Sequence, residues 1–109
     1  MPSETPVADT LAQITAASLM NSQLPAREFM LARIAALIAA DAPALSYVLN
    51  VGPAADSGVS LADVQDVLVA VAPIVGTARV VTAAANIVKG LGFVVDLAEA
   101  ELEAEAAED

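Results

Sequence analysis

Ser46 and Asn50 lie four residues apart, and this spacing places a hydroxyl and an amide on the same face of a helix. Such a pair can hydrogen-bond a small ligand. The alternative, which we favour, is that both side chains bond to backbone carbonyls near a bend at Pro53. Tyr47, the only tyrosine, offers a weak acid for a pocket, but a buried ring whose hydroxyl has a partner is the simpler expectation.

Three charged side chains add candidates for catalysis or binding. Glu28 is expected in the first turn of a helix, either as an acid–base group or as ordinary compensation of the helix dipole. Arg33 and Arg79 interrupt apolar stretches. Each is expected to form a structural ion pair, with Asp41, Asp66 or an acid of a second subunit, rather than to bind an anion. The candidates for a catalytic site are Glu28, Ser46, Tyr47, Asn50 and Arg79.

The missing residue types narrow the chemistry further. The 109 residues include no cysteine, which excludes a disulfide, a thiolate nucleophile and a cysteine metal site. They include no histidine, the commonest acid–base group near neutral pH and the commonest metal ligand. We therefore expect no metal and no cofactor, and whether the chain is an enzyme stays open.

The charge is unevenly distributed. The net charge is −10, and seven of the 14 acidic residues follow residue 95. The four basic residues form no cluster, which argues against binding to nucleic acid or to a membrane. The acidic end is expected to be a solvated helix end rather than a docking segment. Residues 1–9 have no basic region and no long apolar core, so we expect no secretory signal and a cytoplasmic location.

The apolar pattern predicts an all-α protein, a bundle of five to six helices in a single domain, 1–109. Alanine and leucine are abundant, and apolar residues recur at every three to four positions. We divide the domain into an N-terminal helix and loop (1–23), a core (24–93) and an acidic C-terminal helix or tail (94–109). The expected helices cover residues 5–20, 25–41, 43–56, 60–75, 77–89 and 93–106.

Several residues mark the expected helix ends and inner faces. Ser60 followed by Asp63 resembles a capping box, and Gly58 is expected to end the preceding helix. Gly90 and Gly92 predict a hinge before the last helix. The side chains expected to face inward are Met30, Ile34, Leu37 and Ile38; Val64, Leu68, Val71 and Val75; Val80, Val81, Ala84 and Ile87; and Val94, Leu97 and Ala100.

The chain is unusually apolar for its size. Apolar residues make up 58% of it, and its mean hydropathy is +0.70. Its longest strongly apolar run without a charge, 67–78, spans 12 residues, fewer than the roughly 20 that a membrane-spanning helix needs. A domain of this size buries only about two thirds of its unfolded surface by itself. We therefore expect a homo-oligomer that crosses no membrane.

The middle of the chain has a recognisable order of elements. An alanine-rich helix follows Leu24; the turn and helix start Gly58-Val59-Ser60-Leu61-Ala62-Asp63-Val64 come next; and the Val67-Leu68 pair precedes Gly76 and another helix that reaches Phe93. In this order the segment resembles the carboxymuconolactone decarboxylase and alkyl hydroperoxidase D-like family. The resemblance implies an all-helical bundle that assembles as a homotrimer or homohexamer.

The motif positions of that family are not kept here. Its peroxidase members carry a C-x-x-C-x-x-x-H motif on the helix before the glycine turn and a proton-relaying glutamate on the preceding helix; its decarboxylase members keep only the histidine. Counted back from Gly58 without gaps, Asn50 falls on the histidine and Leu31 on the glutamate. Ser46 and Pro43 fall on the cysteines. Serine cannot form a disulfide, and asparagine cannot exchange a proton near neutral pH.

The resemblance therefore implies a divergent member in which both known activities are in doubt. Our first hypothesis is a non-peroxidase, homo-oligomeric scaffold or small-molecule-binding protein. The second is a lyase or isomerase of a small lactone or carboxylate with a relocated acid–base site, in which Glu28 can replace the missing glutamate. The third is a non-catalytic partner subunit of an active homologue.

Overall fold

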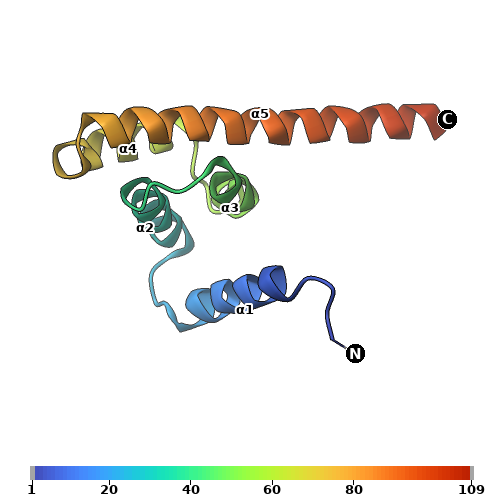
Figure 1. Ribbon diagram of the computed structural model, residues 1–109, viewed down its shortest axis with the longest axis horizontal. Helices are drawn as coiled ribbons and strands as arrows, with labels where there is room; N and C mark the ends of the chain where they lie inside the picture. Colours follow the sequence, from blue (N-terminus) through green and yellow to red (C-terminus); the bar gives the residue numbers. More distant parts are fainter. Residues whose placement is uncertain (1, 109) are drawn as a thin grey trace.

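Five helices account for most of residues 2–108, the part of the chain that the computed structural model describes (Figure 1). They are α1 (Pro6–Asn21), α2 (Ala26–Ala39), α3 (Ala44–Asp56), α4 (Leu61–Val75) and α5 (Thr77–Glu108). No strand occurs among these residues, so the prediction of an all-α protein is confirmed. The helices α2 and α3 lie between α5 on one side and α1 on the other, and α4 packs against both α2 and α5 (Figure 1).

The last helix, α5, is continuous over 32 residues, so the predicted hinge and the division into two helices are wrong. Gly90 is buried within this helix, where a Cβ would lie 3.2 Å from the carbonyl oxygen of Ala44 at the start of α3. Gly90 therefore allows α3 to approach α5 closely. A glycine inside a helix costs only about 1 kcal/mol relative to alanine, which is too little to break a helix that is packed along its length.

The ends of α2 and α3 share one hydrogen-bonding pattern. Gly58 after α3 has a φ of 80°, and Asp41 after α2 has a φ of 58°. In both places the next residue donates its N–H to a carbonyl five positions back, at 2.9 Å for Val59 and 3.0 Å for Ala42. This is the Schellman motif, in which a left-handed residue lets the last helical carbonyls find donors. The prediction that Gly58 ends its helix is confirmed, whereas Asp41 adopts a conformation that favours glycine.

The start of α4 is fixed by the predicted capping box. The Ser60 hydroxyl accepts a hydrogen bond from the Asp63 N–H at 3.1 Å, and the Asp63 carboxylate accepts one from the Ser60 N–H at 2.9 Å. These bonds from Ser60, assisted by Arg27, lower the pKa of Asp63 from its usual value of 3.8. Arg27 and Asp63 also form an ion pair of 2.8 Å between α2 and α4.

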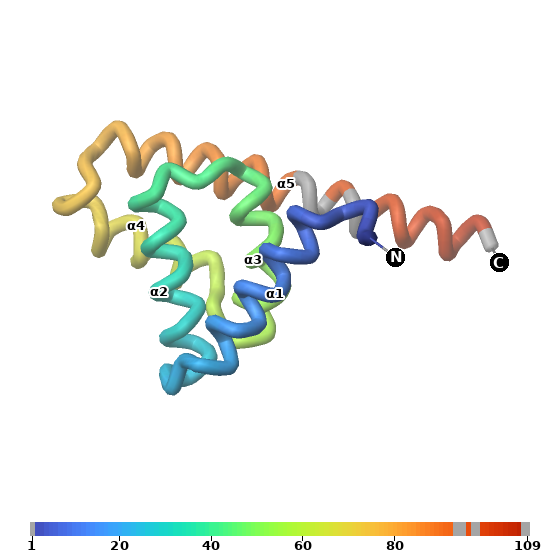
Figure 2. Tube along the Cα trace, turned by 60° about the horizontal axis from the view of Figure 1, so that its bottom comes forward, coloured from blue at the N-terminus to red at the C-terminus, as the bar shows by residue number. Residues whose placement is uncertain are grey.

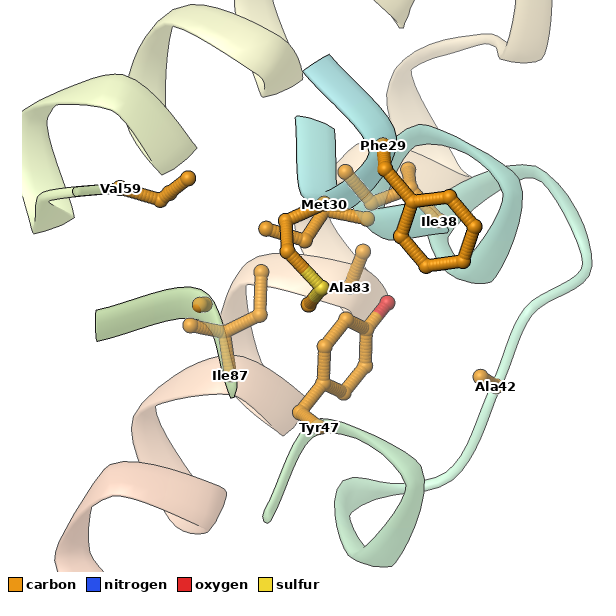
Figure 3. Close-up of a cluster of buried hydrophobic side chains, with 10 residues drawn as sticks. Phe29, Met30, Ile38, Ala42, Tyr47, Val59, Ala83 and Ile87 are labelled. Atoms are coloured by element: carbon orange, nitrogen blue, oxygen red, sulfur yellow. The ribbon is translucent and has the colours of Figure 1, made fainter. Parts of the chain in front are cut away.

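The core is centred on α2, whose side chains meet those of α3 and α5 (Figure 3). Met30, Ile34 and Ile38 are buried, as the spacing predicted, and Ile38 is 0% exposed. Phe29 is buried too, which the sequence analysis did not anticipate. The other buried apolar residues are Ala42, Tyr47, Ala54, Val59, Ala83 and Ile87. Leu37 of α2 and the predicted inner face of α4 are partly buried against this cluster: Val64, Leu68, Val71 and Val75, with Val67 beside them.

The buried face of α5 differs from the predicted one. Val81 is 62% exposed, whereas Ala83 is 1% exposed. Ala83 and Ile87 are four residues apart, so they share the face that meets the other helices. Ala100 is exposed rather than inward-facing. The predicted inner positions Val94 and Leu97 have side chains outside the described part of the structure.

Much apolar surface stays exposed, most of all on α1. This helix has no buried residue, and its Met20 is 85% exposed, as is Ile74 at the end of α4. Within residues 2–108, no helix alone has the length and apolar character to cross a membrane; α3 and α4 reach them only as a pair, and that pair is bent by 120°. The exposed apolar side chains are therefore available for a ligand or for another copy of the chain.

Candidate ligand-binding site

A groove of about 470 Å³ lies between α1 and the α2–α3 pair, and we call it the α1 groove. Figure 2 shows α1 passing close to α3. Its larger apolar lining residues are Leu11, Leu19, Phe29, Met30, Leu37 and Leu49. Its polar lining residues are Thr15, Arg33, Ser46, Asn50, Asp56 and Ser57. Pockets of about 300–1,000 Å³ that combine apolar walls with a few polar groups are typical small-molecule sites.

The polar part of the α1 groove is organised around a hydrogen bond between α2 and α3. The Arg33 Nε group donates to Asn50 Oδ1 at 3.1 Å. Asn50 Nδ2 in turn donates to the Ser46 carbonyl at 2.7 Å, as the sequence analysis favoured. The Arg33 guanidinium carbon lies 5.6 Å from the centre of the Phe29 ring, a cation–π distance. These contacts hold the guanidinium in the groove wall.

The predicted ion pairs of Arg33 and Arg79 within the chain are wrong. Among residues 2–108 the ion pair that forms is the one between Arg27 and Asp63. Arg33 bonds to a neutral amide instead, and Arg79 donates to the Ala39 carbonyl at the C-terminus of α2. A cation at that end of a helix is favourable because the last carbonyls carry partial negative charge. Arg33 is thus the arginine that lines a groove without a carboxylate partner in the described chain.

A second hollow of about 140 Å³, which we call the apolar cavity, lies deeper among α2, α3, α4 and α5. Its lining includes Ile34, Tyr47, Asn50, Val59 and Ile87. Apart from Tyr47, Asn50 and Ser60, every residue that lines it is apolar. An apolar cavity of about this size takes a molecule no larger than benzene. It offers little room for a substrate with several polar groups.

Tyr47 lines the apolar cavity as a buried residue, 6% exposed. Figure 3 shows its ring between Ile87 and Met30. Its hydroxyl has no hydrogen-bond partner, so the expectation of a satisfied hydroxyl is wrong. Burial, together with the negative charge of Asp41, raises the pKa of Tyr47 above its usual value of 10.0. The hydroxyl therefore stays protonated near neutral pH and cannot act there as a base.

Glu28 and Arg79 lie outside both hollows. Glu28 is exposed in the first turn of α2, where it compensates the helix dipole. The five predicted candidates are therefore divided: Ser46 and Asn50 line the α1 groove, Tyr47 and Asn50 line the apolar cavity, and Glu28 and Arg79 line neither. The carboxylate of the α1 groove is Asp56, which no sequence argument singled out.

The positions that match the family motif lie on the elements that the resemblance implies. Ser46 and Asn50 are on α3, which precedes the Gly58 turn, and Leu31 is on α2. Leu31 packs against the core as a partly buried apolar residue. Pro43 is the residue that precedes α3. None of these four side chains is one that takes up and releases protons near neutral pH.

The arrangement suits binding better than acid–base catalysis. Neither hollow brings a carboxylate and a second proton-exchanging group together with a shifted pKa, which such a site requires. In the described part of the chain, no group of three or more acidic side chains is placed to hold a metal ion. Comparison with protein-family models, curated proteins and solved structures gives no match for this chain. The site has to be interpreted from its own residues.

Proposed function

We propose that this protein is a homo-oligomeric, non-peroxidase helical protein that binds a small, largely apolar molecule in the α1 groove. The observation that carries the proposal is the groove itself, in which apolar walls surround Arg33, Ser46 and Asn50. The apolar cavity, at about 140 Å³, is the weaker candidate because it is too small for most metabolites.

The ligand-binding part is tested by amide NMR of the full-length protein, titrated with decanol and with decanoate below their micelle-forming concentrations. We expect chemical-shift changes at Leu11, Phe29 and Leu49, which line the groove. A Leu49→Asp variant should weaken both probes, whereas Val69→Asp, at an exposed position on α4 away from both hollows, should not. If neither probe perturbs the groove, the ligand-binding function is refuted.

The proposal also makes the chain a divergent relative of the carboxymuconolactone decarboxylase and alkyl hydroperoxidase D-like family. Its support is the resemblance in the order of elements, together with an all-helical fold. Without cysteine there is no thiol to reduce a peroxide. An assay with a dithiol donor and a peroxide should give no turnover above the buffer rate; clear turnover contradicts the non-peroxidase assignment.

We infer self-association from the exposed apolar side chains, because a second copy can cover them. Contiguous apolar surface on a small protein commonly marks an interaction site. Size exclusion with light scattering at several concentrations should give three or six times the chain mass of 11.0 kDa. A species of 11.0 kDa at every concentration contradicts the oligomer.

A further inference from the structure

Arg33 is a half-buried cation whose charge no described acid balances. It lines the α1 groove next to apolar side chains, and the described ion pair joins Arg27 to Asp63 instead. Holding a charge among apolar groups is unfavourable unless an opposite charge or hydrogen bonds compensate it. The groove therefore favours a ligand that brings a negative charge to Arg33.

Arg33 keeps hydrogen-bond donors for such a ligand. Its Nε group is engaged with Asn50, whereas its two terminal nitrogens donate to no residue in the described chain. A guanidinium offers parallel N–H groups that match the two oxygens of a carboxylate. Asn50 and the Phe29 ring fix the orientation of this donor pair, so little conformational freedom is lost when a ligand binds.

The rest of the groove suits an aliphatic chain. Leu11 and Leu19 of α1 are 55% and 56% exposed, and Leu49 of α3 is 65% exposed. These three side chains line the same groove as Arg33. A hydrocarbon chain laid along them removes apolar surface from water, which is the main source of affinity for such a ligand. A volume of about 470 Å³ has room for it.

Asp56 limits the charge that the groove accepts. This acid lies six residues after Asn50 on α3, or about 9 Å along the helix. It is far enough from the Arg33–Asn50 bond not to neutralise Arg33 directly, but it repels a second negative group further along the groove. A ligand with one carboxylate at one end fits this distribution, and a dicarboxylate does not.

From these observations we propose that the α1 groove binds an aliphatic monocarboxylate, with Arg33 holding the carboxylate and the leucines of α1 and α3 covering the chain. Asn50 is a positioning residue, because it acts on the ligand through Arg33. This inference rests on the proposed ligand-binding function and names the class of ligand for it.

The test compares decanoate with decanol by calorimetry on the full-length protein, below micelle-forming concentrations. Decanoate should bind about tenfold or more tightly than decanol, because a charge-assisted hydrogen bond is added. Arg33→Gln should remove this preference and leave decanol affinity unchanged. Lys89→Gln is the matched control: it deletes the same charge at an exposed residue that lines neither hollow, and the preference should persist. Arg33→Lys should retain part of it.

Each failure of this experiment has a separate meaning. Equal binding of the two probes, or an unchanged preference in Arg33→Gln, overturns the carboxylate site but leaves the ligand-binding function standing. If neither probe binds, the ligand-binding function fails as well. If Arg33→Gln also lowers the mass seen by light scattering, a second copy of the chain occupies the groove, and the monocarboxylate proposal is overturned. Circular dichroism of each variant shows that the helices are retained.

Discussion

The helices α1 and α2 have similar lengths and compositions but different environments. α1 has 16 residues and buries none of them, whereas α2 has 14 and buries Phe29, Met30, Ile34 and Ile38. The difference comes from the neighbours: α2 packs against α3, α4 and α5, while α1 lies on the outer side of α2 and α3 (Figure 1). Apolar residues on a helix are thus a capacity for burial, which the tertiary fold either uses or leaves for a ligand or another subunit.

The comparison predicts its largest effect for isoleucines in the two helices. Ile38→Ala should lower the free energy of unfolding by about 2–5 kcal/mol, because it leaves a cavity at a fully buried site. Ile14→Ala, in α1 at 60% exposure, should change it by less than about 0.5 kcal/mol in the monomeric chain. Urea unfolding followed by circular dichroism measures both. Equal losses for the two variants would remove the distinction between the helices.

Helix caps extend the comparison to a smaller effect. Ser60→Ala should cost about 0.5–2 kcal/mol because the Asp63 N–H loses its acceptor. Thr5, which precedes α1, makes no side-chain cap, so Thr5→Ala should cost about 0.5 kcal/mol or less. Chemical unfolding of the two variants gives the values, and a Thr5→Ala loss as large as that of Ser60→Ala speaks against the difference.

The capping box also predicts a pH dependence. The folded-state pKa of Asp63 lies below its usual value of 3.8, so its contribution to stability is present above that value and is lost as the pH falls through the folded pKa. The stability difference between the wild type and Asp63→Asn should therefore shrink in acid. An increase of that difference in acid contradicts the assignment.

The end of α2 should be open to improvement, unlike the end of α1. Asp41 holds a positive φ of 58° and places a negative charge at a helix C-terminus, which is unfavourable. Asp41→Gly should therefore stabilise the fold by about 0.5–1 kcal/mol. Ser22, which ends α1 with a φ of −85°, needs no glycine, so Ser22→Gly should not stabilise. Thermal melts of the two variants compare the ends.

The smallest effect is expected at the residue on which α2 packs. Tyr47→Phe removes a buried hydroxyl that has no partner, so it should leave stability unchanged or raise it by up to about 1 kcal/mol. The raised pKa of Tyr47 adds a pH test. Its contribution is present below pH 10.0 and declines above it, where the unfolded chain ionises first. The wild type should lose stability relative to Tyr47→Phe in strong base; a parallel decline contradicts the burial of the hydroxyl.

The sequence predicted the features that depend on neighbouring residues. Ser60 and Asp63 define a helix start through bonds that span three residues, and Gly58 ends a helix through its own φ. The spacing of Met30, Ile34 and Ile38 predicted the buried face of α2 for the same reason. These features need no knowledge of the rest of the fold.

The features that sequence could not supply depend on distant partners. Gly90 resembled a hinge because nothing local shows that Ala44 lies 3.2 Å from its Cβ position. The bond from Arg33 to Asn50 joins residues 17 positions apart, and the sequence shows only two polar residues in apolar helices. The buried face of α5 turned out to include Ala83 rather than Val81, because the crossing with other helices, not hydrophobicity, selects it.

The length of α5 ties the acidic end of the chain to the folded bundle. Its 32 residues extend for about 48 Å, and Figure 1 shows its C-terminal part reaching past the other helices. Glutamates four residues apart, such as Glu99 and Glu103, repel each other along this part. Extending a helix is far easier than starting one, so these turns propagate from turns that the bundle has already ordered. Melting of the bundle should therefore release them in the same transition, and a spectroscopic label near residue 105 would report on a core that it never touches.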